Sequence, residues 1–429
     1  MTDHEIAIVD GVRTPFIKAW TLFDRCPAQE LGAACVTELL QKTGIDPSRV
    51  DEVIMGCVGQ PPEAANVARV ISLMAGIPKD KHACTVNRNC ASGFEAVTSG
   101  AEKIITGQEE TVIAGGAESM SNAPLLFTKE AAGLFMQLQR ARSLGEKLSA
   151  ALRFRPRHFF PTPALQMALT DPTCGLNMGQ TAEVLAKKFA ISRRRQDEFA
   201  LESHVRSSAS RAVFKEETLT FFPSFDYQKA VSADNGIREK QSLADLATLK
   251  PIFDRATGTV TAGNSSQITD GACALLLMNA ALAHAAGYEI LGTIAGHEYA
   301  GVEPSEMGLG PVFAIEKLLR KKRLSLKDVQ LFEINEAFAV QVLSCLDALG
   351  SKLFAQKYFS GQEAVGSIDP SLLNVHGGAI ALGHPVGASG ARLVLTCLKE
   401  MKRRNLRRGL VSLCVGGGQG GAILLERAA

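Results

Sequence analysis

Ala91-Ser92-Gly93 and Ala388-Ser389-Gly390 each open a helical pattern in this chain of 429 residues. The first helical pattern leads to a strand pattern that ends in Gly115-Gly116, and the second leads to one that ends in Gly416-Gly417-Gly418. This recurrence predicts one supersecondary unit used twice, because a single such unit leaves a sheet face unburied.

Short strand patterns alternate with helical patterns around these two units. Pro47–Gly56 leads into an apolar strand, and Leu324–Glu333 does the same in the second half of the chain. Strand patterns of the first half cover residues 6–9, 52–58 and 111–114, and helical patterns cover 30–40 and a stretch from Ser92 onward. The alternation predicts an α/β chain whose parallel strands are buried on both faces.

A compositional break separates the two halves and runs from about Ser121 to Lys250. Residues from Pro251 to Met278 have the pattern of an α/β core again, so we expect the first half to be discontinuous. We therefore predict a first half at 1–120 that continues at 251–279, an inserted segment at 121–250, and a second half at 280–429.

The composition excludes several classes of protein. A net charge of +2, with 21% charged and 46% hydrophobic residues, fits a globular chain and leaves no basic excess for nucleic acid. Ten cysteines without a Cys-x-x-Cys pair argue against zinc-ribbon and thioredoxin-type motifs, and we expect no bound metal. The acidic first residues lack the features of a signal peptide, which predicts a cytoplasmic protein. The weakly polar stretch Ala272–Ala286 is shorter than the ~20 residues of a membrane span.

The segment Lys129–Phe160 of the insert is basic and has an apolar repeat. It contains seven basic and two acidic residues. Apolar side chains recur every three or four positions, at Leu134, Leu138, Ala141, Leu144, Leu148 and Leu152. This amphipathic pattern has two interpretations. One is a solvated helix packed on the body of the protein, and the other is a surface that meets an anionic ligand or an anionic membrane.

Cys90 occupies a position suited to a nucleophile. It stands where a strand pattern ends and Ala91-Ser92-Gly93 begins a helix. The partial positive charge of a helix N-terminus favours the thiolate, which is the reactive form. Because a free cysteine is more often a small buried hydrophobic residue, Cys90 alone does not establish a site.

Three further segments carry reactive groups. His384 stands between glycines and a proline just ahead of a helix, so we expect its side chain to project into a cavity. Asn335 follows a buried strand pattern. Cys414 ends another strand and precedes Gly416, whose backbone N–H could form part of an anion nest. Gly416-x-Gly418-x-x-Gly421 matches a dinucleotide fingerprint, but a strand pattern follows it instead of a helix, which excludes that reading.

A nucleophile, an imidazole, a second thiol and backbone donors form a coherent set for acyl transfer. In this order they resemble the thiolase family, through Cys90-Ala-Ser-Gly, Asn335-Glu-Ala-Phe, Gly383-His-Pro-Val-Gly-Ala-Ser-Gly-Ala-Arg392 and Cys414-Val-Gly-Gly-Gly. The resemblance extends over nearly the whole chain. It implies the thiolase fold, with two βαβαβαββ halves and an inserted loop domain over a coenzyme A (CoA) site.

The resemblance also implies roles for individual residues. Cys90 would accept the acyl group, and His384 would keep the Cys90 thiol ionised. Cys414 would transfer the α-proton of acetyl-CoA. Asn335 would hold a water beside the enolate oxygen, and the N–H groups of Cys90 and Gly416 would bind the tetrahedral oxyanion. Contacts to CoA, a cosubstrate and not a permanent cofactor, are expected from Ser266, Met178 and Phe338.

The family resemblance implies cleavage of 3-ketoacyl-CoA by CoA, and the insert resembles the β-subunit of the fatty-acid-oxidation trifunctional complex. That similarity implies a homodimer or homotetramer and adds a hydratase/dehydrogenase α-subunit as a candidate partner. Asn335-Glu-Ala-Phe instead resembles general thiolases, so an acetoacetyl-CoA thiolase stays open. A ketoacyl synthase would need a second histidine where Cys414 stands. A non-catalytic acyl-CoA-binding protein is the alternative from another class.

Overall fold

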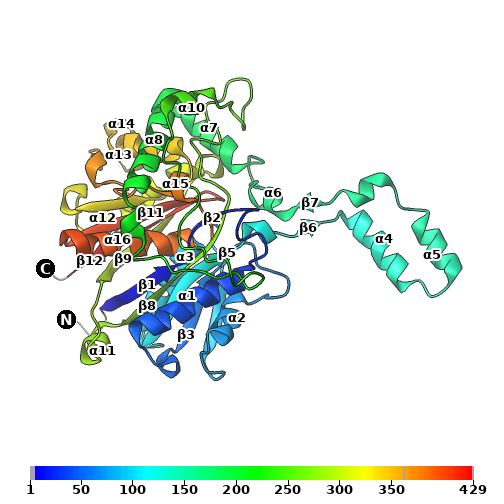
Figure 1. Ribbon diagram of the computed structural model, residues 1–429. Coiled ribbons are helices and arrows are strands. Elements are labelled where there is room, and N and C mark those ends of the chain that lie inside the picture. Colours follow the sequence, from blue (N-terminus) through cyan, green and yellow to red (C-terminus); the bar gives the residue numbers. More distant parts are fainter. Residues whose placement is uncertain (1–4, 361–362, 428–429) are drawn as a thin grey trace.

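The computed structural model describes residues 5–360 and 363–427. Most of its strands join one large mixed sheet, in the order β10-β11-β12-β9-β1-β8-β5-β3-β4 with β2 paired to β8, and β6 and β7 form a separate ribbon (Figure 1). The strands are β1 (Ile6–Arg13), β2 (Ile17–Lys18), β3 (Glu52–Gly56), β4 (His82–Val86), β5 (Thr111–Glu118), β6 (Leu125–Leu126), β7 (Thr162–Pro163), β8 (Thr269–Asn279), β9 (Gly292–Gly301), β10 (Leu331–Ile334), β11 (Arg408–Val415) and β12 (Gln419–Glu426).

The two halves of the large sheet have the same pairing pattern. In the first half β3 pairs with β5 in parallel, and β8 then pairs antiparallel with both β5 and β1. In the second half β10 pairs with β11 in parallel, and β12 pairs antiparallel with both β11 and β9. The counterpart of β4 is reduced to a single bridge between Phe332 and Leu373. The predicted α/β fold with a duplicated unit is confirmed, but the sheet is mixed and not wholly parallel, because each half ends in antiparallel strands.

The chain also forms helices, most of which pack around the strands in three layers. They are α1 (Ala28–Thr43), α2 (Val67–Met74), α3 (Ser92–Ile105), α4 (Lys129–Arg140), α5 (Leu144–Ala151), α6 (Ala164–Ala168), α7 (Met178–Lys188), α8 (Arg193–Ala209), α9 (Arg211–Phe214), α10 (Leu243–Thr248), α11 (Ala280–Ala285), α12 (Gly310–Lys322), α13 (Ala339–Leu349), α14 (Lys352–Tyr358), α15 (Ala379–Leu382) and α16 (Ser389–Arg404). One core packs α1 and α2 on the first half, and another packs α12 and α13 on the second half. The third core lies around α3 and α16 and includes strands of both halves.

Helices α3 and α16 approach each other at backbone distance through glycines. A Cβ added to Gly93 would lie 2.5 Å from the carbonyl oxygen of Gly387, and one added to Gly390 would lie 2.4 Å from the backbone nitrogen of Phe94. A Cβ on Gly116, in β5, would lie 1.9 Å from the Gly387 oxygen. No side chain fits in these positions, so the turns that precede the two helices are held close together.

The strand β8 brings the chain back to the first half after the insert, because it lies between β1 and β5. Part of the insert, including α7, α8 and α10, lies on the body (Figure 1). The domain boundaries at 120, 250 and 279 stay predictions.

A part of the insert that we call the arm, residues 125–163, projects away from the body on the β6–β7 ribbon (Figure 1). The predicted amphipathic segment is not one helix, because the backbone is extended at Ala141 and α5 begins anew after a capping box at Ser143. The interpretation of a helix packed on the body is therefore wrong. The apolar side chains of α5 and its surroundings face solvent instead, with Leu144 84% and Leu152 78% exposed.

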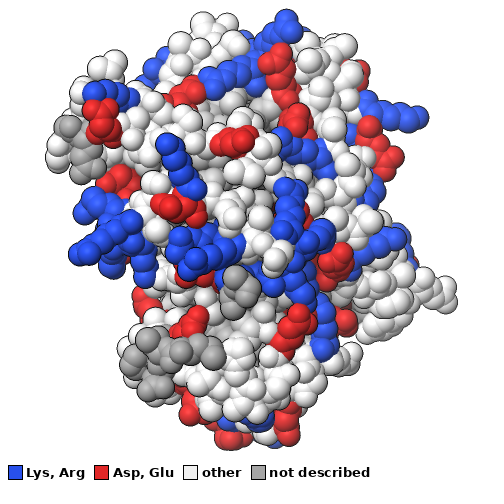
Figure 2. Space-filling view, turned by 90° about the vertical axis from the view of Figure 1, so that its left-hand side faces the viewer, with Lys and Arg blue, Asp and Glu red and all other residues white. Residues whose placement is uncertain are grey.

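Basic side chains also gather on the body, across the face drawn in Figure 2. The last turns of α12 and α16 are both basic, and they end in Lys322 and Arg404. Cations are favourable at helix C-termini. Several of them also pair with carboxylates, such as Lys321 with Glu298. Helix ends and ion pairs therefore account for this band of charge.

The stretch that was judged too short for a membrane span, Ala272–Ala286, falls in β8 and α11. Among the helices of the described ranges, none combines the length and the apolar character needed to cross a bilayer.

We predict that Gly116→Ala destabilises the protein by about 1–3 kcal/mol, because the new Cβ meets backbone that cannot move aside. The matched control is Gly133→Ala in α4, where nothing lies within 4 Å of the added Cβ. This second change is expected to be neutral or slightly stabilising. Urea unfolding followed by circular dichroism measures both, and equal midpoints for the two variants would contradict the proposed close contact.

Candidate active site

Cys90 lies in the turn between β4 and α3. The preceding residue, Asn89, has a left-handed backbone with φ 46°, and its Nδ2 donates a hydrogen bond to the carbonyl oxygen of Gly416 at 2.7 Å. This bond joins the cysteine turn of the first half to the glycine turn of the second half. Cys90 is partly exposed, whereas Ala91 and Ser92 behind it are buried.

The sulfur of Cys90 faces two backbone N–H groups, its own and that of Gly416. Burial raises the pKa of the Cys90 thiol above its ordinary value, although the two N–H groups act in the opposite direction. The position at a helix N-terminus predicts a thiolate. Instead, desolvation of the charged form outweighs the backbone dipoles, so the resting group is a thiol.

His384 lies in the loop that leads into α16, and its hydrogen bonds fix its tautomer. Its Nδ1 lies 2.6 Å from the hydroxyl of Ser389, which itself donates to the carbonyl oxygen of Pro385 at 3.0 Å. Because the hydroxyl proton is used on Pro385, Nδ1 of the neutral ring must be the donor to Ser389. Nε2 is then a proton acceptor, and it lies 3.4 Å from Nδ2 of Asn335.

The His384 ring is neutral at physiological pH. Burial, together with the positive charge of Arg392, lowers its pKa to about 4. Arg392 is itself buried and faces the Glu333 carboxyl at 3.3 Å. Burial raises the pKa of Glu333 to about 8 despite Arg392, so this carboxyl is mostly protonated at neutral pH. The charge of Arg392 therefore stays available to hold His384 in its basic form.

Asn335 directly follows β10, and its backbone N–H donates to the carbonyl oxygen of Ser412 at 2.9 Å. Its side chain is fully buried, yet Oδ1 has no hydrogen-bond partner among the described residues. A buried amide oxygen without a partner is costly, so this position suits a bound water or a ligand donor.

Cys414 is a buried residue near the end of β11. Burial raises the pKa of its thiol far above the ordinary value, and the nearby Cys90 sulfur raises it further. The chain then turns through Gly417 and Gly418, with φ of 89° and 79°, a conformation that favours glycine. This turn leads into β12 and leaves the N–H of Gly416 directed at Cys90.

The structure thus brings five of the predicted residues together from four separate segments. Cys90 contacts Gly416, Cys414 lies near Cys90, and Asn335 links the Cys414 strand to His384. Two thiols, backbone N–H groups and a neutral imidazole, held on segments that contact one another, can perform acyl transfer to sulfur and proton transfer to carbon.

The three residues expected to contact CoA border the same turns. Met178 begins α7, and its sulfur would lie 3.1 Å from a Cβ on Gly416. The backbone N–H of Ser266 donates to the carbonyl oxygen of Ala337 at 2.9 Å. Phe338 is buried, and its ring packs edge-on against Phe253 with centroids 6.1 Å apart. Met178 thus lies beside the glycine turn, and Ser266 lies beside the segment that follows Asn335.

Two positioning residues were not identified from the sequence as such. Ser389 sets the tautomer of His384, and its place in the small-residue motif was the available signal. Glu118 is fully buried and accepts backbone hydrogen bonds from Val58, Gly59 and Gly387. Burial raises its pKa to about 7. Nothing in a single sequence marks a carboxylate that holds three distant N–H groups.

Comparison with known proteins gives full-length matches. The family description "Thiolase, N-terminal domain" matches residues 6–281, and "Thiolase, C-terminal domain" matches residues 288–427. The chain is 40% identical over 428 residues to a 3-ketoacyl-CoA thiolase of Pseudoalteromonas translucida, covering 99% of this chain and 97% of the relative. It is 41% identical over 426 residues to the 3-ketoacyl-CoA thiolase of Shewanella amazonensis, with the same coverage.

Solved structures agree with the sequence matches. The human mitochondrial 3-ketoacyl-CoA thiolase superposes with a TM-score of 0.85 at 34% identity, covering 100% of both chains, and a further structure of it contains CoA. The Bacillus anthracis acetyl-CoA acetyltransferase superposes with a TM-score of 0.85 at 35% identity, covering 99% of this chain and 98% of that one. With both family descriptions and several full-length relatives matching it, this chain belongs to the thiolase family.

Proposed function

We propose that this protein is a 3-ketoacyl-CoA thiolase that cleaves its substrate with CoA through an acyl-enzyme on Cys90. The observation that carries the proposal is that the Cys90 thiol lies beside the N–H of Gly416 and near the Cys414 thiol, while Asn335 joins the Cys414 strand to Nε2 of His384. The names of its relatives supply the substrate class.

In the first half-reaction, Nε2 of His384 takes the proton of Cys90, and the thiolate attacks the 3-keto carbon. The oxyanion that forms is stabilised by the N–H groups of Cys90 and Gly416, and such a donor typically contributes about 10²–10³ in rate. The C2–C3 bond then breaks, leaving an acyl group on Cys90 and the enolate of acetyl-CoA. The imidazolium of His384 and a water on Asn335 face the enolate oxygen.

Cys414 returns a proton to the α-carbon of the enolate and releases acetyl-CoA. Its raised pKa suits this role, because the residue rests as a thiol that can act as an acid. In the second half-reaction the thiol of CoA attacks the acyl group on Cys90, and the product is an acyl-CoA shortened by two carbons. The Cys90 thiolate leaves in this step and takes its proton back from the imidazolium of His384. The proton that CoA loses restores the Cys414 thiol.

The CoA approach is inferred along α7. A cavity of about 510 Å³ lies beside this helix and is bordered by Phe253, Lys187 and Arg255. Glu183 and Asp254 also line this cavity, and Lys187 pairs with Asp254 at 2.8 Å, so Arg255 and the Phe253 ring are the groups that suit a phosphorylated nucleotide. Phe253 packs against Phe338. The human relative solved with CoA supports this cosubstrate.

An acetoacetyl-CoA thiolase is the second candidate, favoured by the similarity to the Bacillus anthracis acetyl-CoA acetyltransferase.

The proposal also covers the assembly of the protein and its compartment. We infer a homodimer or homotetramer, with a hydratase/dehydrogenase α-subunit as candidate partner. Cytoplasmic location is supported by the ten cysteines, which are all free in the structure.

We further propose that the arm makes peripheral contact with an anionic membrane. Phe127, Phe135, Phe154 and Phe159 form an aromatic cluster of its own inside the arm. Leu144 and Phe160 remain exposed, the latter at 74%. Arg153, Arg155 and Lys129 border a cavity of about 610 Å³ beside them. Exposed apolar groups next to unpaired cations suit the interface of an anionic bilayer.

The catalytic proposal predicts that Cys90→Ala lowers CoA-dependent cleavage by at least about 10³-fold, because the nucleophile is removed. Cys174→Ala removes another partly exposed thiol and should leave the rate unchanged. Mass spectrometry of the wild type after mixing with acetyl-CoA should place an acetyl group on Cys90. Full activity of Cys90→Ala would refute the acyl-enzyme.

The same assay with short- and long-chain 3-ketoacyl-CoA esters separates the two candidate functions, since exclusive short-chain cleavage favours the acetoacetyl-CoA enzyme.

The pH dependence of alkylation tests the charge state of Cys90. Because burial raises its pKa above 9.0, the rate of its reaction with iodoacetamide should keep rising as the pH increases through 9.0. In the denatured chain the same peptide should react with an ordinary thiol pKa of about 8.5. Peptide mapping follows both rates. A native rate that reaches its plateau below pH 7 would mean a resting thiolate instead.

The membrane proposal predicts that the wild type floats with anionic phospholipid vesicles and not with neutral ones. Reversing three arm charges, in Lys147→Glu/Arg153→Glu/Arg155→Glu, should weaken vesicle binding about 100-fold, since each cation near the surface contributes about 1 kcal/mol. The matched control reverses three exposed charges of the body, in Arg49→Glu/Lys79→Glu/Lys327→Glu. Equal flotation of the two variants would remove the arm from the membrane contact.

A further inference from the structure

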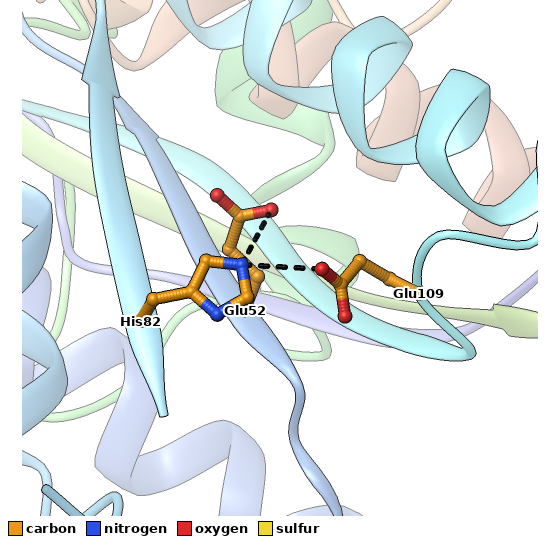
Figure 3. Close-up of side chains that lie close together, drawn as sticks. All are labelled: Glu52, His82 and Glu109. Atoms are coloured by element: carbon orange, nitrogen blue, oxygen red, sulfur yellow. Dashed lines mark ion pairs between the residues drawn. The ribbon is translucent and has the colours of Figure 1, made fainter. Parts of the chain in front are cut away.

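A group of metal-ligating side chains lies at the far end of the sheet and takes no part in the proposed reaction. His82 begins β4, Glu52 begins β3, and Glu109 lies in the loop before β5. Their ligating atoms all lie within 4.8 Å of one another, and Figure 3 shows the three side chains pointing toward one another. Because β3 and β4 are parallel and Cys90 follows the end of β4, the group lies at the opposite end of these strands from the active site.

Strand register explains why these residues meet. Glu52 is the cross-strand partner of His82. Cys84 stands two residues after His82, so the pleat places it on the same face of the strand. Its thiol is hydrogen-bonded to the Glu52 carboxylate. Since β4 is the edge strand and the His82 side chain is 58% exposed, a solute can reach this face from solvent.

Two carboxylates of the group share one imidazole and one ammonium. Nε2 of His82 lies 3.1 Å from the Glu109 carboxylate and 3.6 Å from the Glu52 carboxylate. The ammonium of Lys103, from α3, also bonds to Glu52. Glu52 is almost fully buried, so its charge requires a cation close by.

We propose that Glu52, His82 and Glu109 form a binding site for a divalent transition-metal ion of the zinc type. Imidazole and carboxylate are among the ligands that zinc takes, and three protein donors with one water complete its usual tetrahedral coordination. Magnesium and calcium are disfavoured, because both select all-oxygen sites.

Binding exchanges one cation for another at Glu52. The metal ion displaces the ammonium of Lys103 from the Glu52 carboxylate. The bound ion then ties β3, β4 and the loop before β5 together at the edge of the sheet. None of the three donors takes part in the proposed acyl transfer, so the inference stands apart from the proposed function.

Calorimetric titration with zinc chloride tests the site in the full chain carrying Cys90→Ala, which removes the partly exposed active-site thiol as a competing ligand. We expect one zinc ion per chain. Adding His82→Gln should weaken binding at least about tenfold, since a direct ligand is lost. Adding Lys103→Met should tighten binding at least about tenfold, since a competing positive charge is removed. His297→Gln is the matched control, because His297 also pairs with a glutamate at the surface, and it should bind zinc like the parent.

Thermal unfolding gives a second readout. Zinc should raise the melting temperature of the parent and of His297→Gln, but not that of His82→Gln. Absence of saturable binding to the parent, or equal affinity of the parent and His82→Gln, would overturn the site. Unchanged affinity in Lys103→Met would overturn the assignment of Glu52 as a ligand.

Discussion

Backbone contact between the first turns of α3 and α16 is the constraint on which the rest of the molecule depends. Gly93 and Gly390 allow the helices to meet without side chains between them, and Gly116 admits the carbonyl of Gly387 to the end of β5. Because the two backbones are in direct contact, neither helix can move toward the other without a clash. Cys90 and His384 lie just ahead of these helices, so the geometry of the site is set by rigid elements and not by loop conformation.

The same close packing determines the charge state of the site. Burial favours the neutral forms of Cys90 and His384, and the charge of Arg392 acts in the same direction on the imidazole. A resting ion pair here would bear a large desolvation cost, which the neutral pair avoids. In the proposed reaction, charge then develops only when substrate is attacked, at the position where the N–H groups of Cys90 and Gly416 are available to stabilise it. Donors that stabilise charge in the transition state, and not in the bound substrate, lower the activation barrier and do not merely tighten substrate binding.

Local signals could be predicted from the sequence, and interactions between distant segments could not. The strand from Glu52, the helix from Ser92 and the end of β11 follow from apolar runs bounded by small residues. The role of Ser389 depends on where its own proton goes, and that of Glu118 depends on N–H groups from two remote loops. The direction in which the arm projects could not be predicted, because the periodicity of apolar residues identifies an apolar face but not the surface that covers it. The capping box at Ser143 starts α5 as a separate helix, so the predicted continuous helix does not form.

The insert divides into a part held by buried charge and a part that is not. Arg13 of β1 is fully buried and pairs with Glu217 at 2.6 Å and with Asp234 at 2.7 Å, and Thr396 of α16 donates to Glu217 at 2.9 Å. Breaking such a buried pair typically costs about 3–5 kcal/mol, so this part of the insert is fixed to both halves. Within the described residues no ion pair joins the arm to the body, and its charged groups pair only with one another. The arm can therefore change its surface without disturbing the candidate site.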